Sequence, residues 1–195
     1  MSFEFSKARF LDVIRMIEDY RLDIRTVTMG ISLIGCTRPT TKATAQAVYD
    51  RVMERARDLV PVCEGIEREL GIPIVNKRIS VSPIALVAAG AEGNPVDIAH
   101  ALDRAASELG VNFVGGYSAL VEKGGTTADK RLIYSIPEAL AETDNVCSSV
   151  NVASSRAGIN MNAVAKMGEI VKEAAEATAD RSSIACAKLV VFANA

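Results

Sequence analysis

Cys36 and Arg38 are the residues whose types and spacing are best suited to covalent chemistry. Cys36 follows a glycine where a predicted strand ends, and Arg38 lies two residues further along the chain. A nearby cation lowers the pKa of a thiol, and the thiolate is the stronger nucleophile. We therefore predict Cys36 as the catalytic residue of an enzyme. The alternative is that Cys36 is a small apolar residue packed at the strand end, since free cysteines are often buried.

Hydroxyl and amide side chains are frequent where the other predicted strands end. In parallel sheets and α/β barrels, ligands bind at the carboxyl ends of the strands. A guanidinium group can hold a carboxylate or phosphate through two parallel hydrogen bonds. The alternative is that these small residues only permit tight turns and dense packing. The residues predicted to bind a small polar or anionic metabolite are Arg38, Ser82, Tyr117, Ser118, Asn151 and Arg156.

Two adjacent cations, Lys77 and Arg78, lie inside a predicted strand. They cannot both point to solvent if helices cover the sheet. Either one of them lines a polar face and meets an anion, or it pairs with an acidic residue of a covering helix. Gly115 and Gly116 indicate a close approach of the backbone to a neighbour. No established phosphate-binding motif accompanies them.

The sequence predicts no metal site and identifies no cofactor. The cysteines are widely separated, no CxxC pair occurs, and His100 is the only histidine. This pattern fits neither a disulfide scaffold nor a local zinc site. The N-terminal residues also lack the uninterrupted apolar stretch of a secretory signal. We therefore predict a cytoplasmic protein with reduced thiols, in which Cys63, Cys147 and Cys186 are structural.

Composition narrows the classes of partner. The chain has 195 residues, of which 49% are hydrophobic and 24% charged, which is typical of a folded globular protein. The net charge of −2 provides no global positive field, and aromatic residues make up only 5% with no Trp. These values argue against a nucleic-acid partner. The longest apolar helix candidate, 84–91, is far shorter than a membrane span, so no membrane partner is expected.

Helical and extended patterns alternate along the chain. Apolar residues at helical spacing and β-branched runs define the two kinds of segment. Pro61 is expected to kink or break the longest helix. Strands are predicted over 24–34, 72–81, 111–120, 146–153 and 187–193. Helices are predicted over 6–20, 41–70, 84–89, 95–109, 137–142 and 162–177.

Five strands separated by helices predict an α/β fold with a five-stranded parallel sheet, in one domain over 1–195. Buried parallel strands are usually continuous runs of Val, Ile and Leu. Here they also carry polar residues, so one sheet face should be polar, like the inside of a ligand-holding barrel. The chain stops at an apolar strand, as a chain cut within a domain would. The polar strand residues are Thr26, Thr28, Ser32, Asn76, Lys77, Arg78, Tyr117, Ser118, Ser148, Ser149 and Asn151.

Six segments, 23–33, 70–81, 113–120, 142–152, 157–161 and 187–195, resemble an uncharacterised bacterial family named after pyruvate formate-lyase. The resemblance implies one half of a ten-stranded α/β barrel like that of pyruvate formate-lyase and ribonucleotide reductase. It also implies that the chain is the N-terminal portion of a longer protein. A small ACT-domain protein is implied as a partner. No catalytic residue is carried over, because the family has no established site.

These observations predict a metabolite-binding barrel protein, which is an enzyme or only a binding protein. The alternative function is a non-catalytic regulator that works with an ACT-domain partner. A further alternative is a folding half without a function of its own. A half-barrel would expose its edge strands, which favours pairing with another chain. We therefore predict self-association as a homodimer or larger oligomer.

Overall fold

Five parallel strands and one short antiparallel strand form a sheet in the computed structural model, which describes residues 11–12, 14–16 and 24–194. The predicted mixed α/β class is confirmed. The additional strand is the two-residue antiparallel β5, which the sequence did not predict. The strands are β1 (Ile24–Ile31), β2 (Ile74–Val81), β3 (Phe113–Leu120), β4 (Val146–Ser154), β5 (Gly158–Ile159) and β6 (Leu189–Ala193).

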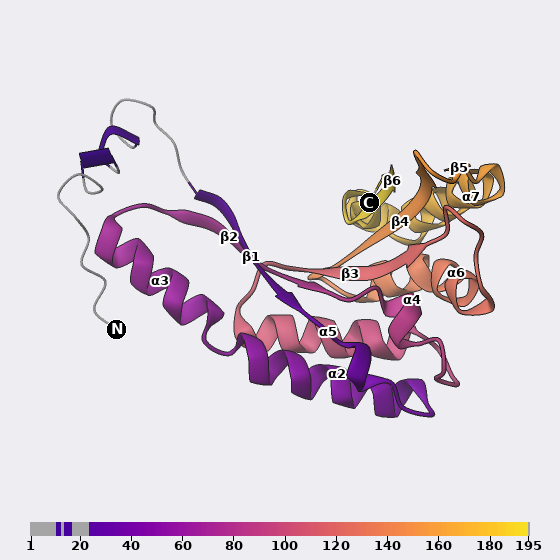
Figure 1. Cartoon of the computed structure of the whole chain (residues 1–195), viewed down its shortest axis with the longest axis horizontal. Coiled ribbons are helices and arrows are strands. Elements are labelled where there is room, and N and C mark those ends of the chain that lie inside the picture. Colours follow the sequence, from indigo (N-terminus) through magenta and orange to yellow (C-terminus); the bar gives the residue numbers. More distant parts are fainter. Residues whose placement is uncertain (1–10, 13, 17–23, 195) are drawn as a thin grey trace.

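Helices connect the parallel strands (Figure 1). The helix predicted over 6–20 lies for the most part outside the described residues. The short helices η1, η2 and α8 were not predicted. The helical elements are η1 (Ile34–Cys36), α2 (Thr41–Ala56), α3 (Leu59–Leu70), α4 (Ile84–Val87), α5 (Val96–Leu109), α6 (Thr127–Glu142), α7 (Met161–Ala177), η2 (Ala179–Arg181) and α8 (Ile184–Ala187).

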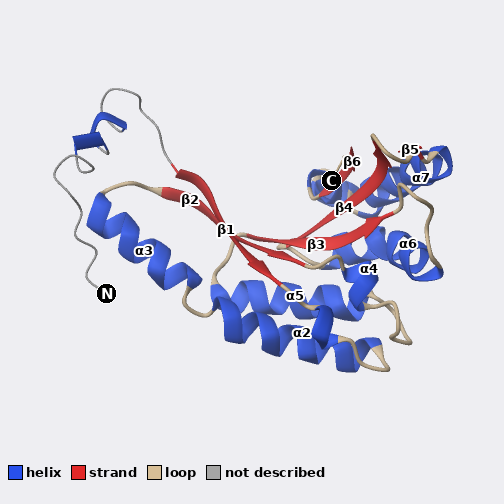
Figure 2. Ribbon diagram, in the orientation of Figure 1, coloured by secondary structure: helices blue, strands red, loops and turns tan. Residues whose placement is uncertain are grey.

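The parallel strands lie side by side in their order along the chain, β1-β2-β3-β4-β6. Crossovers between parallel strands are almost always right-handed. A sheet whose order never reverses therefore places its connecting helices on one side. Figure 2 shows α3, α2, α5, α6 and α7 along one side of the curved sheet, and none of these helices covers the opposite side. This arrangement is compatible with half of a barrel.

The hydrophobic core lies between the sheet and its helices. Alternate strand residues point toward the helices and are buried there, as the two-residue period of a strand requires. Ile79, Val114 and Val150 supply this layer from the central strands. The helices contribute their apolar faces to the same cluster, including Val48, Val52, Ile98, Leu102, Leu132, Ile136, Leu140 and Ile170.

The break in the long predicted helix occurs just before Pro61. Helix α2 ends at Ala56 and α3 begins at Leu59, so Pro61 lies in the first turn of α3. A proline is tolerated there, because the amides of a helix's first turn have no intrahelical acceptor. The predicted interruption at this proline is confirmed.

Helix α6 starts ten residues earlier than the predicted start at 137. The Thr126 hydroxyl accepts a hydrogen bond from the Asp129 amide at 3.2 Å, and the Asp129 carboxylate accepts one from the Thr126 amide at 2.8 Å. This reciprocal capping box nucleates the helix at its N-terminus. Pro137 then lies inside the helix, whose apolar face is held by packing against the core.

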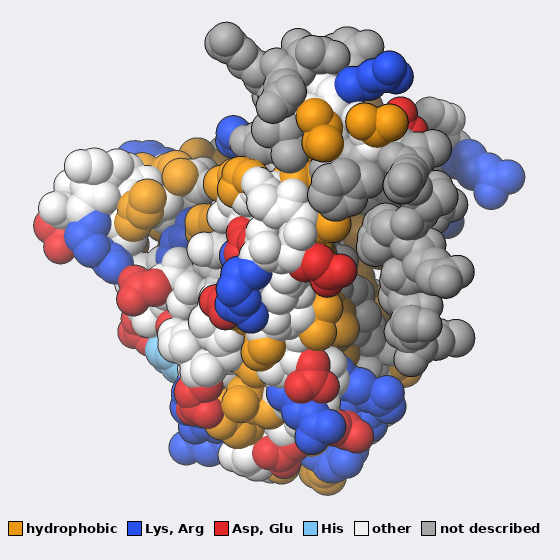
Figure 3. All heavy atoms as spheres, turned by 90° about the vertical axis from the view of Figure 1, so that its left-hand side faces the viewer, with side chains coloured by type: hydrophobic (Ala, Val, Ile, Leu, Met, Phe, Trp, Pro, Cys, Tyr) orange, Lys and Arg blue, Asp and Glu red, His pale blue; other side chains and the backbone are white. Residues whose placement is uncertain are grey.

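Charged side chains of both signs are interspersed over the lower part of the side shown in Figure 3, beside the helices. Mixed charge of this kind is typical of a solvated surface rather than of a ligand site. Among the described helices, none combines the length and the apolar character that crossing a membrane requires.

Candidate functional site

The side of the sheet that the helices leave open is lined mainly by small and polar residues. Strand register places Thr28 opposite Arg78, Ser80 opposite Gly115, and Gly115 opposite Cys147. Residues opposite one another in register share a face. A polar face is therefore present, although Lys77, Tyr117 and Ser148 of the predicted polar residues lie on the helical side instead. We call this face the uncovered face. It comprises Thr26, Thr28, Gly30, Asn76, Arg78, Ser80, Phe113, Gly115, Ser118, Leu120, Cys147, Ser149, Asn151, Val190 and Phe192.

A pocket of about 380 Å³ lies in the middle of the uncovered face. Strands β1 to β4 all contribute to its walls, so residues distant in sequence meet there. A hollow of this size is at the lower end of the range for small-ligand sites. We call it the Arg78 pocket; it is lined by Thr28, Arg78, Ile79, Ser80, Phe113, Gly115, Cys147 and Ala187.

The guanidinium group of Arg78 has no anionic partner within the described part of the chain. Its Cζ atom lies 5.2 Å from the centre of the Phe113 ring, so the aromatic face orients it. The Nε atom is buried and donates no hydrogen bond to any described residue. Burying part of a charged group without a partner costs free energy, and a bound anion would remove that cost.

Lys77, the neighbour of Arg78, points to the helical side instead. Its Nζ lies 3.1 Å and 3.2 Å from the two carboxylate oxygens of Glu67 on α3. Glu67 also accepts a hydrogen bond from the Ile74 amide at 2.6 Å. This backbone bond and the Lys77 bond hold the pKa of Glu67 below its usual range. Of the two predicted roles for these cations, Lys77 takes the ion pair and Arg78 the polar face.

Cys36 is buried in the hydrophobic core at the end of η1, with only 3% of its surface exposed. Burial raises the pKa of its thiol, more than the charges of Arg51 and Arg38 lower it. Arg38 thus acts on the thiol pKa in the expected direction, but burial outweighs it. Arg38 is exposed and donates hydrogen bonds to the Gly35 and Thr37 carbonyl oxygens at 3.2 and 2.8 Å. The catalytic role of Cys36 stays a prediction, without support from its surroundings.

Tyr117 points toward the helices because β3 contains a bulge. The register between β3 and β4 shifts between Gly115 and Tyr117, where Gly116 adopts the left-handed φ of 124°. Without this extra residue, Tyr117 would share the uncovered face with Gly115. Instead its side chain is fully buried, and its hydroxyl lies 2.6 Å from that of Ser135 on α6. Burial raises the pKa of the phenol, so Tyr117 stays neutral.

Two other predicted binding residues do meet on the uncovered face. Ser118 faces Ser149 and donates to the Gly116 carbonyl oxygen at 3.2 Å, and Asn151 lies on the neighbouring strand. The Asn151 amide nitrogen donates to Glu122 at 3.1 Å, while its buried Oδ1 accepts no hydrogen bond from the described residues.

The remaining two predicted binding residues, Ser82 and Arg156, lie apart from that pair. Ser82 accepts a hydrogen bond from the Leu33 amide at 3.1 Å, which ties the end of β2 to that of β1. Arg156 is exposed in the turn between β4 and β5. The predicted metabolite-binding residues therefore do not form one site.

Cys147 is the pocket residue that sequence reasoning missed, since it was assigned a structural role. It is partly exposed and lines the Arg78 pocket. Burial raises the pKa of its thiol, although Lys188 and Arg78 act in the opposite direction. The spacing in the sequence could have identified it. Cys147, Ser149 and Asn151 follow one another at intervals of two in the same strand, so they share one face of the sheet.

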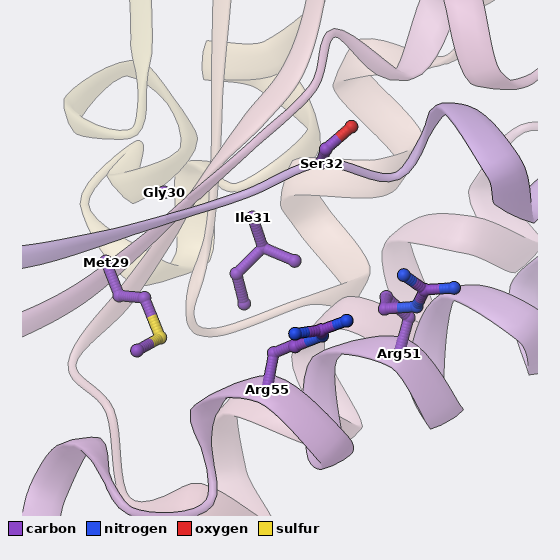
Figure 4. A pocket seen from close by; sticks show the side chains of 6 residues that line it. All are labelled: Met29, Gly30, Ile31, Ser32, Arg51 and Arg55. Carbon is purple, nitrogen blue, oxygen red and sulfur yellow. The ribbon is translucent and has the colours of Figure 1, made fainter.

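A second cation-lined pocket, of about 370 Å³, lies at the carboxyl end of β1, between that strand and α2 (Figure 4). Its cations are Arg51 and Arg55, neither of which the sequence predicted as a site residue. They lie near the strand end where Cys36 and Arg38 were expected to act. We call it the Arg51–Arg55 pocket; Met29, Gly30, Ile31 and Ser32 complete its lining.

No group of three His, Cys, Asp or Glu side chains within 11–12, 14–16 and 24–194 is placed to hold a metal ion.

Comparison with known proteins identifies the relatives of this chain. The model of the family described as "Uncharacterised ACR (DUF711)" matches residues 15–195. A UPF0210 protein of Corynebacterium glutamicum is 74% identical over 189 residues, which cover 97% of this chain and 41% of that protein. A UPF0210 protein of Pelotomaculum thermopropionicum is 60% identical over 185 residues, covering 94% of this chain and 41% of that protein. The chain thus spans about two fifths of the length of these curated relatives.

These matches correct the resemblance to the family named after pyruvate formate-lyase. The matching family and relatives carry the names DUF711 and UPF0210, and nothing in them links the chain to pyruvate formate-lyase. The identification was therefore wrong. The ACT-domain partner was inferred from that resemblance alone and loses its support.

Proposed function

The chain belongs to the DUF711 family of uncharacterised proteins, and we propose that it binds a small anionic metabolite on its uncovered face through Arg78. The observation that carries this proposal is Arg78 itself, which lines a pocket and whose buried Nε lacks a hydrogen-bond acceptor within the described residues. An arginine fork pairs best with a planar carboxylate or a phosphate group. The anion would supply the acceptors that the described residues do not.

The other pocket residues fit a small polar ligand. Thr28 and Ser80 place hydroxyl groups beside Arg78, and each can donate or accept a hydrogen bond. Gly115 keeps the pocket open, because no atom other than its chain neighbours lies within 4 Å of the position a Cβ would occupy. Phe113 adds an apolar wall that can contact the ligand's carbon skeleton. A charged fork, hydroxyls and an apolar wall form a plausible recognition set for a short organic acid or phosphate ester.

Binding is better supported than covalent catalysis. The raised pKa of the Cys147 thiol keeps it protonated near neutral pH, where the thiol is a weak nucleophile. The role of an ACT-domain partner stays a prediction. Because the relatives are more than twice as long as this chain, any activity of a whole family protein lies outside this proposal.

The proposal is tested by measuring binding of acetate, succinate, inorganic phosphate and glycerol 3-phosphate by isothermal titration calorimetry. Arg78→Gln should weaken the tightest of these interactions by at least about tenfold, since a charge-assisted hydrogen bond contributes roughly 1.5–3 kcal/mol. Arg104→Gln is the matched control, because Arg104 also lies over an aromatic ring, 4.0 Å from the centre of Tyr49, but away from the uncovered face. Equal affinities for the Arg78 variant and the unmodified chain would refute the proposal.

A further inference from the structure

We infer that the Arg51–Arg55 pocket is a separate binding site for a small dianion, either a phosphoryl group or a dicarboxylate. Its two cations come from the helical side of the sheet, whereas Arg78 lies on the uncovered face. The two pockets share no residue. This inference therefore stands independently of the function proposed above.

Helix geometry directs the two arginines to one place. Arg51 and Arg55 are four residues apart on α2, a spacing that puts side chains on the same face of a helix. Figure 4 shows both guanidinium groups near the space beneath β1, toward which the Met29 and Ile31 side chains also point. The strand thus supplies apolar side chains on one side of the pocket, and the helix supplies two adjacent positive charges on the other.

The positive charge of this pair is poorly compensated within the described residues. One oxygen of Glu54 lies 3.8 Å from the Nε of Arg51 and 3.9 Å from the Nε of Arg55. Both distances exceed hydrogen-bond range, and the arginine side chains are 40% and 60% exposed. Such exposed ion pairs contribute little. One loosely placed carboxylate for two guanidinium groups leaves a net positive charge, which a dianion would neutralise.

The strand beside the pocket offers further hydrogen-bond donors. Strand β1 pairs with β2 along one edge, and no described strand pairs with its other edge. An unpaired edge presents backbone amides that a ligand can reach. Gly30, near the end of β1, and Ser32, just beyond it, both line the pocket. The pocket volume of about 370 Å³ suits a short ligand, so a phosphoryl group or a short dicarboxylate is the chemistry that fits.

The test is a titration of the ¹⁵N-labelled chain with inorganic phosphate, succinate and acetate at constant ionic strength, followed by NMR. Phosphate, succinate or both should shift the amide resonances of Gly30, Ile31 and Ser32 in a saturable manner. Acetate, with one negative charge, should bind at least about tenfold more weakly. Saturation by phosphate alone would identify a phosphoryl site, and saturation by succinate alone a dicarboxylate site.

Arg51→Gln and Arg55→Gln should each weaken this binding by at least about tenfold, at unchanged thermal midpoint. Arg57→Gln is the matched control, because Arg57 directly follows α2 and is more exposed, but does not line the pocket. The inference is overturned by the absence of saturable shifts in the millimolar range, or by an equal loss of affinity in Arg57→Gln. The shifts should persist in Arg78→Gln, so failure of this site and failure of the Arg78 site are distinguishable.

Discussion

Arg78 and Lys77 show how one step along a strand decides the role of a cation. Alternation in β2 places Lys77 on the helical side, where Glu67 neutralises it, and Arg78 on the uncovered face, where no described acidic residue does. The sequence predicted that the two must differ. It could not assign the roles, because the position of Glu67 relative to β2 depends on how α3 packs.

At the scale of single residues, the rates at which the cysteines react test which of their side chains are accessible. Cys147 and Cys186 are partly exposed, whereas Cys36 and Cys63 are buried. We expect iodoacetamide to label Cys147 and Cys186 well before Cys36 and Cys63. An anion that binds the Arg78 pocket should slow labelling of Cys147 several-fold and leave Cys186 unchanged. Peptide mass spectrometry over a time course measures each rate, and rapid labelling of Cys36 would restore it as a candidate nucleophile.

At the scale of elements, the departures from prediction have local causes. The capping pair Thr126 and Asp129 is visible in the sequence and indicates the observed start of α6 at Thr127, ten residues before the predicted start at 137. The bulge at Gly116 is harder to foresee. A glycine pair allows a bulge, yet only the pairing with β4 shows that Tyr117 turns toward the helices as a result.

The two glycines of β3 should respond differently to alanine. A Cβ on Gly116 would lie 2.6 Å from the Val81 carbonyl oxygen, at a φ that alanine disfavours. Gly116→Ala should therefore lower the free energy of unfolding by about 2 kcal/mol or more. Gly115→Ala meets no atom within 4 Å and should change stability by less than about 0.5 kcal/mol. Denaturant unfolding measures both, and equal losses would contradict the bulge.

The stability of the junction between α3 and β2 should depend on pH through the carboxylate of Glu67. The pKa of Glu67 is lowered in the folded chain by the Ile74 amide and Lys77, so the unfolded chain binds more protons between the two pKa values. Its stabilising contribution is thus present above the ordinary carboxyl pKa and is lost as the pH falls through the lowered one. Glu67→Gln should reduce the thermal midpoint at pH 7 and flatten its decline with acidification.

Glu69→Gln, two residues further along α3, is the control for this prediction, because Glu69 forms no ion pair with any described residue. Thermal unfolding from pH 3 to 7 separates the variants. A Glu67 variant that follows the unmodified chain over the whole range would show that the contact contributes nothing.

At the scale of the whole molecule, the order of the strands determines where a ligand can bind. Alternating patterns were sufficient to predict five parallel strands and a polar face, because both follow from local periodicity. They could not show that the strand order never reverses, or that Thr28, Arg78 and Cys147 meet in one pocket. These features depend on register between segments more than a hundred residues apart. The single domain over 1–195 stays a prediction.

Self-association is the expectation that belongs to this scale. Strands β1 and β6 each lack a described neighbour on their outer edge, and Leu120 and Val190 are exposed on the uncovered face. Unpaired edges and exposed apolar residues favour pairing with a second copy. We predict a dimer at micromolar concentrations by analytical ultracentrifugation. A chain that remains monomeric at the highest soluble concentration would contradict this prediction.

Binding at the uncovered face is tested most directly by the Nε–H resonance of Arg78 in a ¹H–¹⁵N spectrum of the labelled chain, assigned through its loss in Arg78→Gln. This group is buried and donates to no described acceptor. If the pocket binds an anion, addition of acetate, succinate, inorganic phosphate or glycerol 3-phosphate should shift the resonance in a saturable manner and slow its exchange with water. A resonance that stays unchanged with all four anions would contradict the proposed function.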